Sequence, residues 1–380
     1  MSIQVLKPKF HIDECLDGVR ECLEKGWTGM GFKTAEFEQK WNEYTGHNNS
    51  YYINSNTVGL HLAVKILKMQ NGWNDGDEII STPITFISTN HAVLYENLHV
   101  TFADVDEYLC LDPEDVKKKI TDKTRAIIFV GYGGRVGQLD KIIEICKEHN
   151  LKLILDAAHM SGTRVNGVFP GTWDGVDVTV YSFQAVKNLP TGDSGMICFK
   201  SDEYDSICRK IAWLGINKDT YARSTNSGSY KWNYDVEYVG YKYNGNAIMA
   251  AIGLTQLKYL DEDNARRREI AKKYTEGFKN NPNIKIVGAP YADECSYHIY
   301  ELIVPDREKL LSVMAANDIY GGVHYRDNTE YRMYSYAHGT CPHAHEVSNH
   351  LITMPLHMWL TDEDVDKIIK IVNDCVSEGK

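Results

Sequence analysis

LKLILDAAH, at residues 151–159, is a short run of large aliphatic side chains that ends in an acid and a histidine. VDVTVYSF, at residues 176–183, is a second short run, rich in β-branched and aromatic residues. Runs of this length and composition are typical of buried strands. They belong to a region, residues 78–199, in which strand-like and helix-like runs alternate. This alternation predicts an α/β fold with crossover helices between parallel strands.

The other periodic runs complete the expected secondary structure. Strands are expected at 78–82, 100–105, 125–132, 151–156, 176–183 and 196–199, with helices at 58–67, 88–96 and 139–149. Residues 247–278 are expected to form one long helix that bridges two domains. Further on, the expected elements are strands at 284–287 and 297–304, a helix at 306–317, and a last helix capped by Thr361 and Asp364.

Composition excludes several classes of function. The chain has 380 residues, 43% of them hydrophobic and 24% charged, which suffices for one large domain and a smaller one. The formal net charge is -11, so there is no basic excess to neutralise a phosphate backbone, and nucleic acid is not an expected partner. No apolar run approaches the roughly 18 residues of a membrane span, so no membrane association is expected.

The cysteine pattern indicates a compartment. The nine cysteines are spread singly, with no C-x-x-C pair, and no secretory leader is evident ahead of them. An odd number of dispersed cysteines favours reduced thiols, and we expect a cytoplasmic protein. The pattern contains no expected metal site.

Two residues stand where cofactor chemistry would place them. Asp156 ends one expected strand and Lys187 lies in the loop after another. Parallel strands present their active groups at their carboxyl ends, so these side chains are expected at one edge of the sheet. A cofactor held as a Schiff base needs a buried lysine, and a pyridine ring that acts as an electron sink needs a carboxylate at its nitrogen. Taken singly, however, a loop lysine is usually solvated and an Asp at a strand end is often only a helix cap.

The segment 54–60, with the sequence NSNTVGL, adds the chemistry of a phosphate site. Its amide and hydroxyl side chains open the helix expected at 58–67. Backbone amides at a helix N-terminus bind phosphate, although a simple N-cap explains the same residues.

Taken in order, these and other short motifs resemble the DegT/DnrJ/EryC1/StrS sugar aminotransferases, which are fold-type I pyridoxal 5′-phosphate (PLP) enzymes. The resemblance covers nearly the whole chain. It rests on Trp27-Thr28-Gly29, Glu36-Phe37-Glu38, and the segments at 55–60, 76–80, 82–86, 156–159, 182–195, 240–244, 250–257, 324–325 and 356–357. It implies a mostly parallel seven-stranded sheet in a large domain (1–260), whose N-terminal segment packs toward a smaller C-terminal α+β domain (261–380).

The resemblance also implies roles for individual residues. Lys187 would hold PLP as a Schiff base, Asp156 would pair with the pyridine nitrogen, and Phe86 would stack on the ring. The residues implied in contacts with the phosphate and the rest of the cofactor are Asn56, Thr57, Ser182 and His159, together with Lys242 and Asn244 from the neighbouring subunit of a homodimer. The residues implied in substrate binding are Trp27, Thr28, His324, Tyr325 and Arg326.

Several positions depart from the family pattern. His159 stands where many members have Gln, so it is either a cofactor contact or a core histidine. Asn56 replaces a common Gly, Asp193-Ser194 replaces the usual Glu-Gly, and 244–246 lacks the frequent Arg-Met or Asn-Met pattern. These departures leave the substrate open.

The implied reaction is ping-pong transamination from L-glutamate to a keto-sugar. A nucleotide-linked 4-keto-6-deoxy sugar of surface polysaccharide biosynthesis is expected, with Arg326 and Arg332 available for a phosphate. A smaller phosphorylated ketone, such as the triose phosphate dihydroxyacetone phosphate, is the alternative acceptor. A PLP-dependent sugar dehydratase would carry His at the position of Lys187. A non-catalytic protein on this fold would be expected to lose Lys187 or Asp156.

Overall fold

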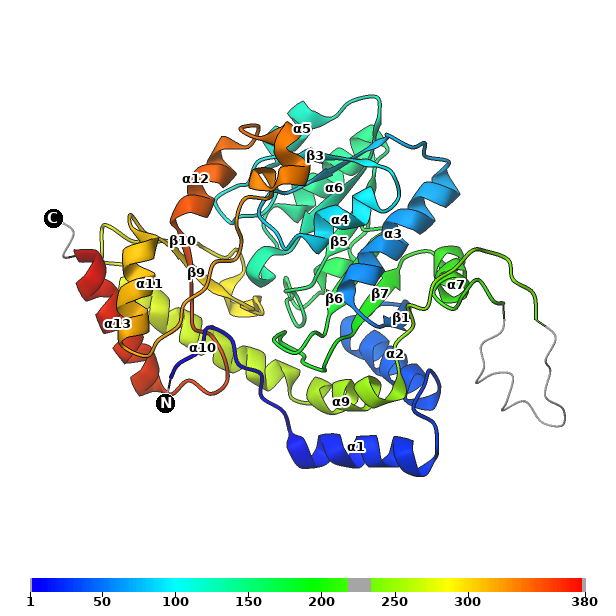
Figure 1. Cartoon of the computed structure of the whole chain (residues 1–380), viewed down its shortest axis with the longest axis horizontal. Helices are drawn as coiled ribbons and strands as arrows, with labels where there is room; N and C mark the ends of the chain where they lie inside the picture. The colour runs from blue at the N-terminus through cyan, green and yellow to red at the C-terminus, as the bar shows by residue number, and fades with distance from the viewer. Residues whose placement is uncertain (1, 218–233, 378–380) are drawn as a thin grey trace.

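The central feature of the computed structural model, which describes residues 2–217 and 234–377, is a seven-stranded sheet (Figure 1). Its strands are β1 (Asn49–Ile53), β2 (Glu78–Ser81), β3 (His99–Phe102), β4 (Thr124–Val130), β5 (Lys152–Asp156), β6 (Val178–Ser182) and β7 (Gly195–Phe199). The spatial order is β1-β7-β6-β5-β4-β2-β3. Strand β7 runs in the direction opposite to the other six strands. The expected mostly parallel sheet is confirmed, and six of its strands lie within a few residues of their expected positions.

Strand β1 was not among the expected strands. It pairs with β7 so that Ile53 lies opposite Gly195, which in turn lies opposite Ser182 of β6. Because β7 runs against the others, its first residues lie at the edge where β1 and β6 end. The residues just before β7 therefore join the same edge as the loops after the parallel strands.

Helices cover both faces of the sheet (Figure 1). The helices of this part are α3 (Asn56–Asn71), α4 (Ser88–Leu94), α5 (Pro113–Lys119), α6 (Leu139–His149) and α7 (Asp202–Ile211). Helix α3 packs against β6 and β7, and α6 packs against β4 and β5. Gly59 lets α3 approach the sheet closely, because a Cβ at this position would lie 2.4 Å from the Ile53 side chain and 2.5 Å from Val180.

The prediction of one long helix at 247–278 is wrong. These residues form two helices, α9 (Ala247–Leu257) and α10 (Leu260–Phe278), which are separated by Lys258 and Tyr259. The Tyr259 ring stacks on His11 at 3.4 Å between ring centroids, and its hydroxyl binds the Glu14 carboxylate. The break thus coincides with the docking of the N-terminal segment, which no Gly or Pro in the sequence marks. That segment continues into α1 (Ile12–Glu24), which lies along α9, and α2 (Phe32–Thr45) (Figure 1).

The C-terminal part has a second, smaller sheet. Its strands are β8 (Lys285–Ile286), β9 (Tyr300–Ile303) and β10 (Leu351–Met354), in the antiparallel order β10-β9-β8. Its helices are α11 (Arg307–Ala316), α12 (Pro342–His350) and α13 (Asp362–Ser377), and its short 3-10 turns are η3 (Ala292–Glu294), η4 (Asn328–Glu330) and η5 (Arg332–Ala337). The expected cap of the last helix is confirmed, because Thr361 and Asp364 exchange hydrogen bonds of 3.1 Å.

The N-terminus lies against this smaller sheet region. Ile3 bridges to Ile319, and it belongs to the same buried cluster as the core of α10 and α13. The expected division between residues 260 and 261 falls at the start of α10, and it stays a prediction.

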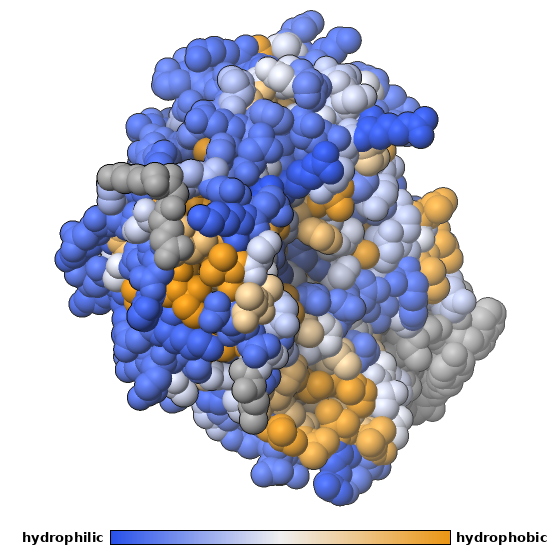
Figure 2. Space-filling view, turned by 60° about the vertical axis from the view of Figure 1, so that its left-hand side comes forward, coloured by the Kyte–Doolittle hydropathy of each residue, from blue (hydrophilic) through white to orange (hydrophobic). Residues whose placement is uncertain are grey.

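The surface carries its hydrophobic groups in separate patches on a mostly hydrophilic face (Figure 2). Within residues 2–217 and 234–377, no helix combines the length and the apolar character that crossing a membrane requires.

Candidate active site

A cavity of about 450 Å³ lies at the carboxyl edge of the large sheet, where it meets the C-terminal part of the chain. Loops after β1, β2, β5 and β6 line it, together with residues that precede β7. The predicted site residues that line it are Asn56, Thr57, Phe86, Asp156, His159, Ser182, Lys187, His324 and Tyr325. The structure thus gathers nine of the predicted residues, from five separate stretches of chain, around one space.

Lys187 is held in this cavity by the loop that follows β6. Its backbone amide donates to the Gln184 carbonyl at 2.8 Å, and Thr191 closes the loop with a 2.8 Å bond to Phe183. Burial lowers the pKa of Lys187 to about 8, and the nearby charge of Asp156 opposes this shift. A lysine with this pKa has an appreciable neutral fraction near pH 7, so it can act as a nucleophile.

Asp156 ends β5 as a buried carboxylate. Oδ2 accepts a 2.8 Å bond from the Thr89 hydroxyl, and Oδ1 accepts from the Ala158 amide at 3.2 Å and the Asn56 side chain at 3.3 Å. Burial raises its pKa, whereas these hydrogen bonds lower it. All three donors are neutral, so the negative charge of Asp156 suits the protonated nitrogen of a pyridine ring.

Groups that can bind the negatively charged phosphate lie beside the N-terminus of α3. The Ser55 hydroxyl caps this helix through the Val58 amide at 3.4 Å, and Asn56 and Thr57 form its first turn. Ser182 contributes a hydroxyl from the end of β6. Hydroxyl groups and a 16-residue helix that begins here suit a phosphate.

Two aromatic side chains border the cavity at Phe86 and Tyr325. Phe86 is 59% exposed, and its ring centroid lies 6.1 Å from that of Tyr325. An exposed aromatic ring that borders a cavity can stack on the flat face of a ligand.

His159 has both ring nitrogens engaged within the chain. Nδ1 accepts from the Gly133 amide at 3.1 Å, which leaves Nε2 to donate to the Tyr325 hydroxyl at 3.1 Å. Burial lowers the pKa of His159 well below its usual value, so the ring is neutral. Both expectations for this residue are thus compatible with its position, because it is satisfied by hydrogen bonds and also lines the cavity.

The residues expected from a neighbouring subunit lie outside this cavity. The Lys242 ammonium lies 3.1 Å from the centroid of the Trp213 ring, and the Asn244 side chain donates to the Gly245 carbonyl at 2.9 Å. Their contact with a partner's cofactor stays a prediction.

Three predicted substrate residues also lie away from the cavity walls. Trp27 is half-buried, Thr28 is exposed and its carbonyl accepts from the Ala247 amide at 3.0 Å. The Arg326 guanidinium lies 5.4 Å from the Tyr331 ring centroid.

Thr89 and His298 are among the cavity residues that the sequence did not predict, and each contacts one of the two central side chains. Thr89 in α4 donates a hydrogen bond to Asp156, and His298, which lies just before β9, approaches the Lys187 amine to 3.3 Å. Neither stands in a motif with local chemical meaning, because a threonine in a helix and a histidine before a strand are both common. Only the packing of distant segments brings them to the site.

A buried ion pair fixes the C-terminal wall of the cavity. Arg135, after β4, lies 2.7 Å from Glu301 of β9, and both side chains are fully buried. The adjacent Gly133 accepts a 3.0 Å bond from the His298 amide, so the same loop positions His159 and His298.

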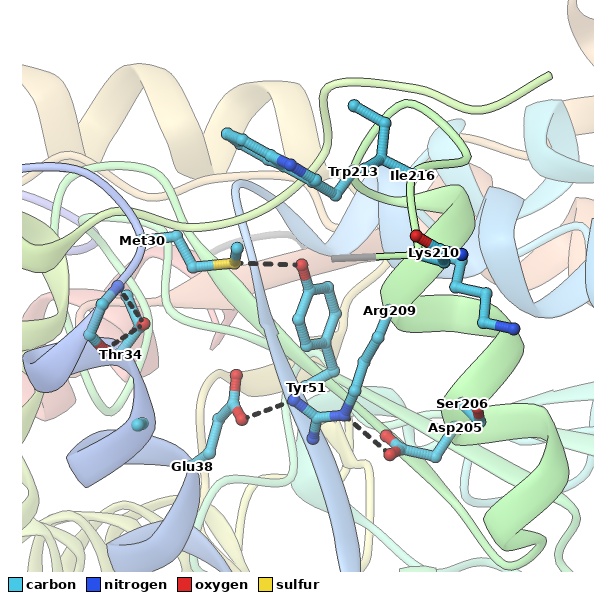
Figure 3. Close-up of a pocket in the computed structure, with 13 residues that line it drawn as sticks. Met30, Thr34, Glu38, Tyr51, Asp205, Ser206, Arg209, Lys210, Trp213 and Ile216 are labelled. Carbon is cyan, nitrogen blue, oxygen red and sulfur yellow. Dashed lines mark hydrogen bonds and ion pairs between the residues drawn. The ribbon is translucent and has the colours of Figure 1, made fainter. Parts of the chain in front are cut away.

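A second cavity of about 400 Å³ is lined by residues of α2, β1 and α7 (Figure 3). Arg209 crosses it and pairs with Glu38 at 2.9 Å and Asp205 at 2.7 Å. The charge of Arg209 is already matched by two carboxylates. Tyr51 and Met30, also in contact there, carry no acid–base chemistry of the kind found around Lys187.

One group of possible metal ligands occurs in the described part of the chain, outside the cavity that contains Lys187. One atom each of Asp327, Glu330 and His345 lies within 4.8 Å of the others, and His345 Nδ1 lies 3.3 Å from Asp327 Oδ2 and 3.4 Å from Glu330 Oε1. The expectation that no metal takes part in the chemistry stays a prediction.

Comparison with known proteins identifies the fold and its chemistry. The model of the DegT/DnrJ/EryC1/StrS aminotransferase family matches residues 11–373. The chain belongs to this family. Fold-type I architecture, PLP dependence and aminotransferase activity follow from this membership.

Individual relatives agree with the family over nearly their full lengths. The chain is 32% identical to the spore coat polysaccharide biosynthesis protein SpsC of Bacillus subtilis, and the match covers 96% of this chain and 94% of SpsC. The aminotransferase TlmJ of Streptoalloteichus hindustanus superposes with a TM-score of 0.90 at 30% identity, covering 99% of both chains. A sugar aminotransferase of Streptococcus pneumoniae, Spr1654, has been solved in PLP and PMP forms. Its PMP form superposes with a TM-score of 0.90 at 25% identity, covering 100% of this chain and 98% of that one.

Proposed function

We propose that this aminotransferase moves an amino group from L-glutamate to a nucleotide-linked 4-keto-6-deoxy sugar during surface polysaccharide biosynthesis, such as that of a capsule or lipopolysaccharide. The observation that carries the reaction type is the cavity in which a buried lysine of lowered pKa and a buried carboxylate line one space. The similarity to SpsC supports the polysaccharide context.

PLP, when bound, supplies an electron sink that stabilises a carbanion at the amino-bearing carbon of the substrate. Asp156 would hold the proton on the ring nitrogen, and the bonds from Thr89 and Ala158 keep this carboxylate oriented. Phe86 would cover one face of the ring, and Ser182 with the first turn of α3 would hold the phosphate. The free amine of Lys187 would act as the base that takes the proton from the donor carbon in the first half-reaction, and as the acid that supplies a proton to the acceptor carbon in the second.

The space beside the cofactor cavity favours a large acceptor. An adjoining cavity of about 680 Å³ shares Thr85, Phe86 and Tyr325 with the first and extends to Tyr331 and Arg332. A sugar that reacts at the cofactor could place a nucleotide there, with Arg332 available for its diphosphate. A triose phosphate would leave this second space unused, although Lys187 and Asp156 would act on it in the same way.

We infer a homodimer whose active sites each include residues of both subunits. Lys242 and Asn244 would serve the partner's cofactor, because they line no part of the cavity within their own chain. We also infer a reducing compartment such as the cytoplasm, since all nine cysteines are buried free thiols.

The first test is the absorbance spectrum of the protein with PLP, before and after L-glutamate. We expect a visible band in the wild type that bleaches with glutamate and is absent in Lys187→Ala, while the exposed-site control Lys147→Ala behaves as wild type. Addition of acceptors to the bleached protein should restore the band with a nucleotide-linked 4-keto sugar and not with dihydroxyacetone phosphate. Restoration by the triose phosphate alone would overturn the sugar assignment, and a Lys187→Ala protein that keeps the band would overturn the site.

A further inference from the structure

A chain of hydrogen-bonded side chains leads away from the Lys187 amine. The Lys187 Nζ lies 3.3 Å from His298 Nε2, and the other nitrogen of this ring, Nδ1, lies 3.0 Å from Asn188 Oδ1. The Asn188 side-chain nitrogen donates to the Ser296 carbonyl at 2.8 Å and to the Asn264 side-chain oxygen at 2.8 Å. The Asn264 amide nitrogen in turn donates to the Ser161 carbonyl at 2.9 Å.

The direction of every bond in this chain follows from its ends. A backbone carbonyl can only accept, so the Ser296 carbonyl requires the nitrogen of Asn188 on its side and leaves the oxygen of Asn188 facing His298. His298 Nδ1 must therefore carry the hydrogen. Its Nε2 then presents a lone pair to Lys187.

The surroundings keep the His298 ring neutral. Burial lowers the pKa of His298 well below its usual value, and the positive charge of Lys187 acts in the same direction. The other charged or titratable groups that face it are His159, whose ring centroid lies 4.4 Å away, with Arg267 and His324. Asp156 is the group of opposite charge that acts on Lys187 itself. A neutral imidazole in this tautomer is a hydrogen-bond acceptor throughout the physiological pH range.

We propose that His298 is a positioning residue, whose Nε2 accepts a hydrogen bond from the free Lys187 amine and so directs the lone pair of that amine into the cofactor cavity. A neutral amine has two hydrogens and one lone pair, so a fixed acceptor for one hydrogen restricts where the lone pair can point. A lone pair that points into the cavity is needed when Lys187 captures the cofactor. It is needed again when the free amine moves protons during the reaction. It requires aminotransferase chemistry at Lys187, but it does not depend on the identity of the sugar acceptor.

The test measures how fast cofactor-free protein captures PLP, followed by growth of the visible band, across the pH range 6 to 10. His298→Leu keeps the volume but offers no acceptor, and we expect capture to slow by about tenfold, the effect of one lost hydrogen bond to a reacting group. His298→Gln restores an acceptor oxygen, and we expect it to recover most of the rate. The exposed His149 provides the matched control, since His149→Gln should capture PLP as the wild type does.

A second measurement does not depend on activity. ¹⁵N NMR of the imidazole groups, with the His298 signal assigned by its loss in His298→Gln, should show a neutral ring with the hydrogen on Nδ1. In Asn188→Ala the signal should shift toward the other tautomer. Equal capture rates in His298→Leu and wild type, His298→Gln as slow as His298→Leu, or a hydrogen on Nε2 in the wild type would each overturn the proposal. Because capture needs neither glutamate nor a sugar, an error in the proposed substrates would leave these outcomes unchanged.

Discussion

Removal of one partner of the buried pair Arg135–Glu301 should destabilise the protein far more than removal of both. Both side chains are fully buried at a 2.7 Å separation, so neither charge can reach water when its partner is lost. Arg135 retains carbonyl acceptors at Gly288 (2.8 Å) and Val287 (3.3 Å), whereas no residue that the structure describes donates a hydrogen bond to Glu301 Oε1. Breaking a buried pair typically costs about 3–5 kcal/mol. We expect Glu301→Gln near the low end of this range, since Arg135 keeps its carbonyls, and Arg135→Met near the high end.

The assay is urea unfolding followed by fluorescence, with the cofactor removed from every variant. The double variant Arg135→Met/Glu301→Leu replaces the pair by apolar groups, and we expect it to be more stable than Arg135→Met alone. The exposed pair of Lys370 and Asp374 supplies the control, and Asp374→Asn should change the free energy of unfolding by less than about 0.5 kcal/mol. A loss below about 1 kcal/mol in Arg135→Met would refute the reasoning, because it would mean that water or another donor reaches Glu301.

Four further outcomes are expected. Capture of PLP should accelerate as the pH rises through about 8 and then level off. The reason is that burial lowers the pKa of Lys187 to about 8, and only the neutral amine attacks. A stopped-flow pH profile with no change near pH 8 would contradict this. Between pH 8 and the ordinary lysine pKa of 10.5, the unfolded chain binds more protons at Lys187 than the folded chain does. Lys187 therefore makes the free energy of unfolding rise with pH across that window. This rise should be smaller in Lys187→Met. Asp156→Asn should still bind PLP but should slow the glutamate half-reaction on the order of 100-fold, since a neutral amide cannot keep the ring nitrogen protonated; an unchanged single-turnover rate would remove Asp156 from this role. Gly59→Ala should lower the stability by about 1–3 kcal/mol in thermal unfolding, because its Cβ would lie 2.4 Å from Ile53, and an unaffected midpoint would show that α3 can shift outward.

Much of the fold could be predicted because its strands are unusually clear in the sequence. β4, β5 and β6 are buried on both faces, so they read as continuous apolar runs that stop at polar residues. β1 lacks this signal, because its sequence NSYYI begins with polar residues and resembles a loop. It becomes a strand only through its pairing with β7. The break between α9 and α10 has no local signal for a related reason, since it contains no Gly or Pro and coincides with contacts from Tyr259 to the distant His11 and Glu14.

The amino-acid sequence by itself determined the reaction class of this protein. Lys187 and Asp156 each follow a strand in an ordered set of family motifs, and parallel strands necessarily present such residues at one edge. Only the tertiary structure decided what surrounds them. His298 lies just before β9, more than a hundred residues after Lys187 in the sequence, and Glu301 of β9 is held by Arg135 of the large sheet region. Contacts between distant segments depend on how whole layers pack, and no local pattern of residues records that packing.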